Sequence, residues 1–283
     1  MLELRRLASR AQKPSVVEPY QTWDLPDGGV WAEFIRTLYG VMVRFPNLAD
    51  FELSSDGRVV SCAPALDASE ETIEHLYLNQ VLPMALGKSG KLAFQASAVQ
   101  IDEEAVAFVA KSGRGKSTIA AAFAVSGDDF LTDDALILER NNGAYWVQSG
   151  HPSLRLWQDS QEHLVPSALT TSHFAKTRLL AGERLSHSGE PRFLRAAYFL
   201  GDGSAVGMVI RPLAAAESLI EWIKHSFLLD VDHGPSIAAH FNRVAAFANS
   251  ARCYALDYPR RFDVLDEVRN SIRTHSRSLG PAT

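Results

Sequence analysis

The sequence predicts an α/β protein in which a small N-terminal α+β region precedes a larger domain of alternating strands and helices. The first observation is a nearly continuous apolar run, 104–109, typical of a strand buried on both faces of a sheet. The second is a glycine-containing loop, 110–115, that leads from this run into the helical pattern of 117–125. The third is the mixture of strand and helix patterns that continues along the rest of the chain.

The composition is that of a soluble globular protein, with 46% apolar and 22% charged residues. The net charge of −5 argues against nonspecific nucleic-acid binding. No apolar run approaches the roughly 18 residues of a membrane span, and the N-terminus lacks the apolar core of a signal peptide. Cys62 and Cys253 lie too far apart in sequence to indicate a zinc site or a disulfide framework. We therefore expect a cytoplasmic protein with no nucleic-acid or membrane partner.

A tight Gly-Lys-Ser-Gly turn predicts a boundary between residues 1–86 and 87–283. In the first region, apolar residues at helical spacing predict a helix over 31–43. An alternating segment that turns at an Asp-Gly pair predicts a β-hairpin over 50–61. A helix is expected over 68–84, with Ser69 as its N-cap.

In the second region, the local patterns predict a series of strands and helices, and an Asn-Gly pair predicts one tight hairpin turn. The predicted strands are 91–99, 104–109, 130–132, 135–139, 144–148 and 252–256, and the predicted helices are 117–125, 214–229, 236–249 and 262–276.

The segment 109–118 carries most of a phosphate-binding loop (P-loop), whose pattern is Gly, four residues, Gly-Lys and then Ser or Thr. Glycines let backbone N–H groups turn towards phosphate oxygens, and the following helix N-terminus adds partial positive charge. The lysine can reach the β- and γ-phosphates, and the serine hydroxyl can bind magnesium. We therefore expect ATP and Mg²⁺ as ligands. The predicted nucleotide-binding residues are Ser112, Gly113, Arg114, Gly115, Lys116, Ser117 and Thr118.

Ala110 stands where the pattern has its first glycine. Positive φ costs a non-glycine residue about 1–2 kcal/mol, so this replacement weakens binding if the loop needs that conformation. The plainer alternative is a glycine-rich turn with an unrelated lysine.

Two adjacent carboxylates, Asp133 and Asp134, follow the predicted strand 130–132. In P-loop folds, a carboxylate at the end of a neighbouring strand completes the magnesium shell. A second carboxylate can accept the proton of an attacking hydroxyl or orient a water. Because adjacent strand residues point to opposite faces, the pair suits a division of roles. The alternative is an ordinary acidic turn.

The loop 110–118 and the segment 130–136 together resemble the HPr kinase/phosphorylase superfamily. The similarity is greatest to the shorter HPr-kinase-like proteins of lasso and other modified-peptide gene clusters. Residues 78–83 and 151–157 are also similar to those proteins, and the resemblance extends over most of 30–275. It implies a kinase domain with a fold like phosphoenolpyruvate carboxykinase, and a serine hydroxyl on a peptide or small protein as phosphate acceptor.

On this resemblance, Asp133 matches the catalytic aspartate, Asp134 its acidic neighbour and Ser117 the magnesium-binding serine. We expect Asp133 and Lys116 to act in catalysis, and Ser117 with Asp134 to hold the metal. We expect residues 1–86 either to bind the acceptor or to support the sheet. The sequence is compatible with a homo-oligomer.

The sequence also departs from the family pattern. Gln95 stands where a histidine is usual, and Thr118 stands where an acidic residue is usual. These departures argue against a bifunctional enzyme acting on HPr. They leave open a reduced serine kinase of the peptide-modifying type, a nucleotide-binding relative without activity, and a small-molecule kinase. Gln95 and Arg155 are candidate contacts to the substrate or a phosphate.

Overall fold

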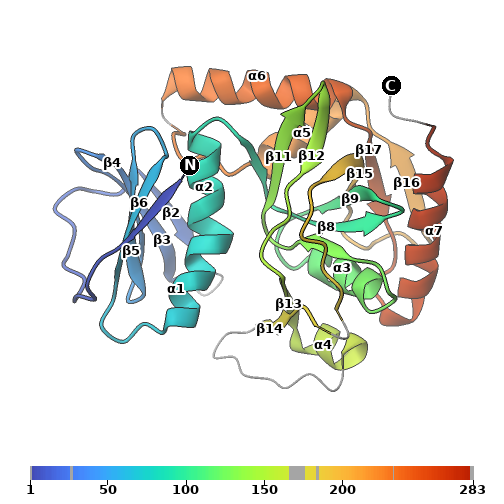
Figure 1. The fold of residues 1–283 in the computed structure, drawn as a ribbon, viewed down its shortest axis with the longest axis horizontal. Helices are drawn as coiled ribbons and strands as arrows, with labels where there is room; N and C mark the ends of the chain where they lie inside the picture. Colours follow the sequence, from blue (N-terminus) through green and yellow to red (C-terminus); the bar gives the residue numbers. More distant parts are fainter. Residues whose placement is uncertain (1, 26–27, 166–175, 183–184, 232, 281–283) are drawn as a thin grey trace. The chain divides into compact units, whose positions relative to one another are not determined.

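The computed structural model describes residues 2–25, 28–165, 176–182, 185–231 and 233–280, and it divides into two compact units (Figure 1). Unit 1 comprises Met1–Lys91 and Phe227–Ser236, and unit 2 comprises Leu92–Ser226 and Ile237–Thr283. The first division falls a few residues beyond the expected boundary. No local sequence pattern predicts that Phe227–Ser236 belongs to unit 1. Helices and strands occur in both units, so the mixed α/β class is confirmed.

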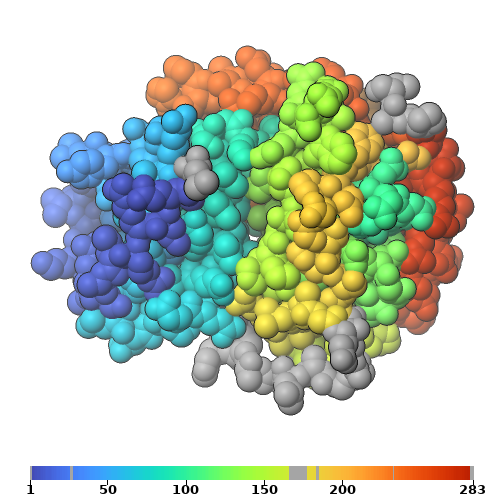
Figure 2. Space-filling view, viewed as in Figure 1, coloured from blue at the N-terminus to red at the C-terminus, as the bar shows by residue number. Residues whose placement is uncertain are grey.

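Unit 1 contains a six-stranded sheet followed by a helical segment. The sheet order is β1-β6-β5-β4-β3-β2, with β1 parallel to β6 and the other neighbours antiparallel. All four residues of β1 are exposed, and this strand lies on the surface of unit 1 (Figure 2). The elements are β1 (Glu3–Arg6), β2 (Gln21–Asp24), β3 (Val30–Arg36), β4 (Gly40–Phe45), β5 (Ala49–Ser54), β6 (Val59–Pro64), α1 (Glu70–Leu76), η1 (Tyr77–Val81) and α2 (Leu82–Lys88).

The helix predicted over 31–43 is wrong, because this segment forms the antiparallel pair β3 and β4. Burial alternates along β4 and over most of β3, as it does when one face of a sheet covers a core. Leu38 is 98% exposed in the connecting turn, whereas a helix with the predicted apolar face would bury it. Gly40 closes the turn at φ 152°, and a Cβ there would lie 2.1 Å from the Leu53 carbonyl oxygen. The turn therefore requires glycine.

The predicted hairpin and the following helix are confirmed. β5 and β6 pair on either side of a turn in which Gly57 has φ 69°. Ser69 caps α1 by accepting a hydrogen bond from the Thr72 N–H at 3.2 Å. The helical segment runs on through the π-helical turn η1 into α2, where Pro83 lies in the first turn. A proline has no N–H and crowds the carbonyl four residues before it, and the wider π turn accommodates that defect.

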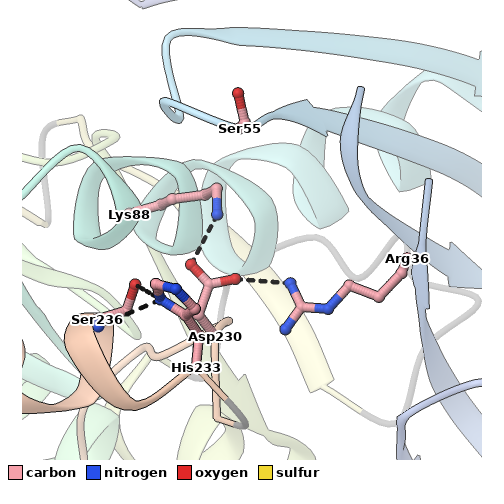
Figure 3. A pocket seen from close by; sticks show the side chains of 6 residues that line it. All are labelled: Arg36, Ser55, Lys88, Asp230, His233 and Ser236. Atoms are coloured by element: carbon pink, nitrogen blue, oxygen red, sulfur yellow. Dashed lines mark hydrogen bonds and ion pairs between the residues drawn. The ribbon is translucent and has the colours of Figure 1, made fainter. Parts of the chain in front are cut away.

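The second segment of unit 1 is bound to the first by Asp230 (Figure 3). Its two carboxylate oxygens accept hydrogen bonds from Arg36 Nη1 and Lys88 Nζ, each at 2.7 Å. The Asp230 and Lys88 side chains are only 12% and 9% exposed. Burial favours a higher pKa for the Asp230 carboxyl, but the hydrogen bonds from Arg36 and Lys88 outweigh it and hold this pKa below its usual range. Both cations therefore bind an ionised carboxylate.

Unit 2 is built on a nine-stranded sheet in the order β10-β8-β9-β15-β12-β11-β7, with β17 pairing β15 and β16. The neighbours β9, β15 and β17 are parallel, so their carboxyl ends lie at the same edge. The elements are β7 (Leu92–Phe94), β8 (Ala96–Ile101), β9 (Glu104–Val109), α3 (Lys116–Ala124), β10 (Phe130–Thr132), β11 (Leu136–Asn141), β12 (Ala144–Val147), β13 (Ser153–Trp157), α4 (Gln158–Leu164), β14 (Lys176–Leu180), β15 (Arg192–Leu200), β16 (Val209–Pro212), α5 (Ala215–Lys224), α6 (Gly234–Ser250), β17 (Cys253–Asp257), η2 (Phe262–Val264) and α7 (Leu265–Ser278).

The central strand β9 is buried on both faces, as its apolar run predicts. Val106 and Phe108 pack into a core that α3 and α7 cover, whereas Ala107 and Val109 pack into a second core under α5 and α6 (Figure 1). The predicted helix over 214–229 is shorter in the structure, because α5 ends at Lys224 and the chain passes into unit 1 at Phe227. In the described part of the chain, no helix has the length and apolarity needed to cross a membrane.

Candidate nucleotide-binding site

The strand, loop and helix expected around the P-loop pattern are all present. β9 ends at Val109, the loop follows, and α3 begins at Lys116. Gly113 and Gly115 have φ values of 78° and 88°, which favour glycine because a side chain would be strained there. Gly115 is also the N-cap of α3, so its backbone leads directly into the first helical turn. N–H groups in that turn have no partner within the helix and are suited to bind an anion.

Ala110 fits the loop without backbone strain. It is buried, with 3% of its surface exposed, and it is not among the residues with positive φ. An L-residue adopts its conformation without the penalty that a left-handed backbone imposes. The alanine therefore does not disturb the loop in the way that its position in the pattern had suggested.

Lys116 lies folded against the loop that it follows. Its ammonium group donates hydrogen bonds to the carbonyl oxygens of Ala110 at 2.8 Å and Lys111 at 3.2 Å. The residue is only 5% exposed. These contacts hold a positive charge across the loop, where a phosphate would lie in a P-loop site.

Asp133 joins three segments of unit 2 at the end of β10. Its Oδ1 accepts hydrogen bonds from the Ser97 hydroxyl at 2.5 Å and the Ser117 hydroxyl at 2.8 Å. Its Oδ2 accepts one from the Arg155 backbone N–H at 3.0 Å. The carboxyl group therefore links β8, the first turn of α3 and β13. Arg155 contacts Asp133 through its backbone N–H. The sequence had suggested a contact from its guanidinium to the substrate or a phosphate.

The neighbouring carboxylate has a different environment. Asp134 adopts φ 65° and is half-buried, whereas Asp133 is only 7% exposed. The strand ends here, because the Ala135 N–H donates to the Asp133 carbonyl and the Thr132 hydroxyl donates to the Ala135 carbonyl. The two neighbouring carboxylates differ in burial, which suits a division of roles. The carboxylate that accepts the Ser117 hydroxyl is Asp133, however, whereas the sequence paired Ser117 with Asp134 for the metal.

Burial is the largest influence on the Asp133 carboxyl and raises its pKa, and the negative charge of Asp134 raises it further. The hydrogen bonds from Ser97, Arg155 and Ser117 act in the opposite direction but do not cancel this shift. The site thus holds a carboxylate that a nearby cation would stabilise.

The outer part of the loop is open to solvent. Ser112, Gly113 and Arg114 are all exposed. The Arg114 guanidinium donates a hydrogen bond to the Asp202 carbonyl at 3.3 Å, on the loop that follows β15. The structure therefore joins Arg114 to a second loop at the carboxyl edge of the parallel strands.

Two further candidates, Thr118 and Gln95, contact neighbouring elements of unit 2. The Thr118 hydroxyl is 3.1 Å from the Ser160 hydroxyl on α4, so it faces that helix. Gln95 lies between β7 and β8, and its backbone N–H donates to the His225 carbonyl at 2.8 Å. This bond joins the end of α5 to the strand that carries Ser97.

Two residues of this region were not found from the sequence. Ser97 is fully buried and binds Asp133, and a hydroxyl within an apolar strand is a signal for it. His225 is 7% exposed. Burial lowers the pKa of its imidazole to about 4, and the positive charge of Lys116 is the next largest cause. His225 follows an ordinary amphipathic helix, so no local pattern marks it.

The donor set fits magnesium bound together with a nucleotide. Among the described residues, no group of three or more His, Cys, Asp or Glu side chains could hold a metal alone. Magnesium commonly uses one or two protein oxygens together with substrate phosphates and water. Ser117 Oγ and Asp133 Oδ1 lie 2.8 Å apart and are oxygen ligands of that kind.

No family model and no curated protein matches the chain. Among solved structures, it is similar to the structure of the Hpr(Ser) kinase/phosphatase from Coxiella burnetii, with a TM-score of 0.35 and 11% sequence identity. The similarity covers 65% of this chain and 95% of that chain. A likeness at this level carries no argument about activity, so the function rests on the geometry of the site.

Proposed function

We propose that the protein is an ATP- and Mg²⁺-dependent phosphotransferase that acts on a serine hydroxyl of a peptide or small protein. The observation that carries the proposal is the contact between Ser117 and Asp133 beside a loop that leads from a buried strand into the N-terminus of α3. Such a hydroxyl–carboxylate pair, next to a helix N-terminus and a buried lysine, is the arrangement that binds a nucleotide triphosphate with its metal. The proposed kinase domain of the HPr kinase and phosphoenolpyruvate carboxykinase type corresponds to unit 2.

Each residue then has a defined role. The loop from Ser112 to Thr118 binds the phosphates through its N–H groups, and the Lys116 ammonium stabilises negative charge on the transferring phosphoryl group. Ser117 and Asp133 hold Mg²⁺, which when bound neutralises charge on the phosphates. Gln95 and Arg155 remain candidates for contacts to the acceptor or to a phosphate.

We assign the acceptor's proton to Asp134, which exchanges the roles that the sequence suggested for the two aspartates. Asp133 is nearly buried, and three donors already occupy its oxygens. An acceptor hydroxyl reaches a half-exposed carboxylate more easily, and Asp134 is half-exposed.

The test is transfer of the labelled γ-phosphoryl group from ATP to a pool of serine-containing peptides, with Mg²⁺ and with a chelator. We expect Mg²⁺-dependent labelling of serine. Asp134→Asn is expected to lower the transfer rate about 100-fold with ATP–Mg²⁺ affinity unchanged, because it removes a proton acceptor. Asp133→Asn is expected to weaken Mg²⁺-dependent binding as well.

Asp67→Asn, an exposed aspartate in unit 1, is the matched control and is expected to change neither property. Transfer that survives Asp134→Asn and fails only in Asp133→Asn restores the original assignment. Tight ATP binding without transfer to any peptide would instead support a nucleotide-binding module. Gln95, at the position where a histidine is usual, favours that second candidate. Transfer to a free hydroxy compound alone would indicate a small-molecule kinase.

A further inference from the structure

A cavity of about 160 Å³ lies in unit 2 beside the P-loop. Gly115 and Thr118 form its wall towards the loop, Trp157 and Ser160 form a second wall, and the segment after β17 closes it. We propose that this cavity binds the base of the nucleotide whose phosphates lie in the loop. The inference rests on the proposed nucleotide binding. It adds a site for the base, which contacts to the phosphates do not recognise.

The position and size of the cavity fit one ring system of a larger ligand. Pockets that hold a whole drug-sized ligand occupy about 300–1,000 Å³, so this one is too small for a complete nucleotide. It adjoins Gly115 and Thr118, which belong to the loop proposed to bind the phosphates. A ligand whose phosphates lie on the loop would therefore extend its other end into this cavity.

The walls offer flat aromatic surfaces. Phe262 is half-buried, and its ring stacks on His163 with centroids 4.6 Å apart and planes at 18°. Trp157 is 44% exposed at another side of the cavity. Aromatic side chains stack on nucleobases of any sequence because every base has a π face. A planar base is thus the ligand group that these surfaces match.

A cation–π pair shapes the back of the cavity. The Arg260 guanidinium lies 4.0 Å from the centre of the Tyr258 ring, and its Nη2 donates to the Gly201 carbonyl at 2.9 Å. Tyr258 is only 2% exposed, and its hydroxyl lies 3.6 Å from where a Cβ on Gly115 would be. The Tyr258 ring therefore packs next to the loop at Gly115. A ligand bound to the loop would lie beside this ring.

One polar group at the rim can recognise the edge of a base. Asp159 is exposed, and its Oδ1 accepts a hydrogen bond from the Ser160 N–H at 2.7 Å. Among the described residues, the hydrogen bonds to this carboxylate all fall on Oδ1. Its Oδ2 can then accept a hydrogen bond from an exocyclic amino group, which inorganic phosphates lack.

The experiment compares the dissociation constants of ATP and inorganic tripolyphosphate by calorimetry in Mg²⁺ buffer, because tripolyphosphate has the phosphates without the base. We expect the wild-type protein to bind ATP at least about tenfold more tightly than tripolyphosphate, as one base–aromatic stack provides. Trp157→Ala and Phe262→Ala are expected to weaken ATP binding about tenfold and to leave tripolyphosphate binding unchanged. Phe262→Tyr keeps a stacking ring and is expected to retain ATP affinity.

Tyr39→Ala removes an aromatic side chain that is 73% exposed in unit 1, and it is expected to change neither constant. Equal affinity of the wild-type protein for ATP and tripolyphosphate would overturn the base site while leaving the phosphate site intact. Equal losses for both ligands in the Trp157 and Phe262 variants would also overturn it. If neither ligand binds the wild-type protein, the proposed function fails instead.

Discussion

The Ser117 hydroxyl donates a 2.8 Å hydrogen bond to Asp133 Oδ1, across a sequence separation of 16 residues. The bond joins the first turn of α3 to the end of β10, so the loop and the acidic turn are fixed relative to each other within unit 2. Ser117 Oγ and Asp133 Oδ1 would both hold a bound Mg²⁺, with the Ser117 hydroxyl keeping its proton and turning it away from Asp133. This arrangement makes the metal dependence of nucleotide binding directly testable.

We predict that Ser117→Ala weakens the Mg²⁺-dependent part of ATP binding. Loss of residues that only support metal ligands costs 10–100-fold in metal affinity, so loss of a direct ligand is expected to cost at least about tenfold. Ser117→Thr keeps the hydroxyl and is expected to retain most of the affinity. The measurement is ATP affinity across a Mg²⁺ titration. Ser55→Ala, at an exposed serine of unit 1, is the control, and an unchanged Mg²⁺ dependence in Ser117→Ala would remove Ser117 from the metal site.

Local patterns in the sequence predicted this strand, loop and helix because each depends on neighbouring residues. The strand before the loop is a continuous apolar run, and Gly113 and Gly115 occupy positions with positive φ. The Ser97–Asp133 contact could not be predicted in the same way, since it depends on how β8 and β10 pair in the sheet. The helix predicted over 31–43 was wrong for a different reason. Its apolar spacing fits a helix and a hairpin alike, and the exposed turn at Leu38 decides between them.

The replacement at Ala110 leads to a prediction that opposes its sequence-based interpretation. Because Ala110 already has an unstrained backbone, Ala110→Gly is expected to change ATP affinity less than about twofold. Glycine gains freedom in the unfolded chain, so the variant is expected to lose about 0.4–1 kcal/mol of unfolding free energy. Calorimetric affinity and denaturant unfolding measure the two effects separately. A large gain in ATP affinity would mean that the loop adopts a different backbone when nucleotide binds.

In unit 1, Asp230→Asn is expected to lower the free energy of unfolding by about 3 kcal/mol. The change leaves the nearly buried Lys88 ammonium without the carboxylate that compensates it. Denaturant unfolding measures this loss. Asp67→Asn is the matched control, since Asp67 is an exposed aspartate of unit 1, and no measurable change is expected. If the two variants unfold alike, the ion pairs of Asp230 do not stabilise unit 1.

Acid is expected to destabilise unit 2 through two buried histidines. Burial lowers the pKa of His225 and of His240 to about 4, and the positive charges of Lys116 and Arg243, respectively, are the next largest causes. In the unfolded chain a histidine titrates near pH 6.5, so between pH 6.5 and about 4 the unfolded state binds more protons. The stabilising effect of keeping these imidazoles neutral is therefore complete at neutral pH and is lost progressively as the pH falls through this interval.

The test measures the thermal midpoint at several pH values between 7.5 and 4.5 for the wild-type protein and for His240→Gln. The His240 Nε2 is buried and has no hydrogen-bond partner among the described residues, so glutamine removes a titrating group without breaking a bond at that atom. The variant is expected to show a smaller decrease in midpoint with falling pH. His233→Gln, at an exposed histidine, is expected to follow the wild-type curve. Identical pH dependence in all three proteins would show that protonation of His240 does not drive the acid transition.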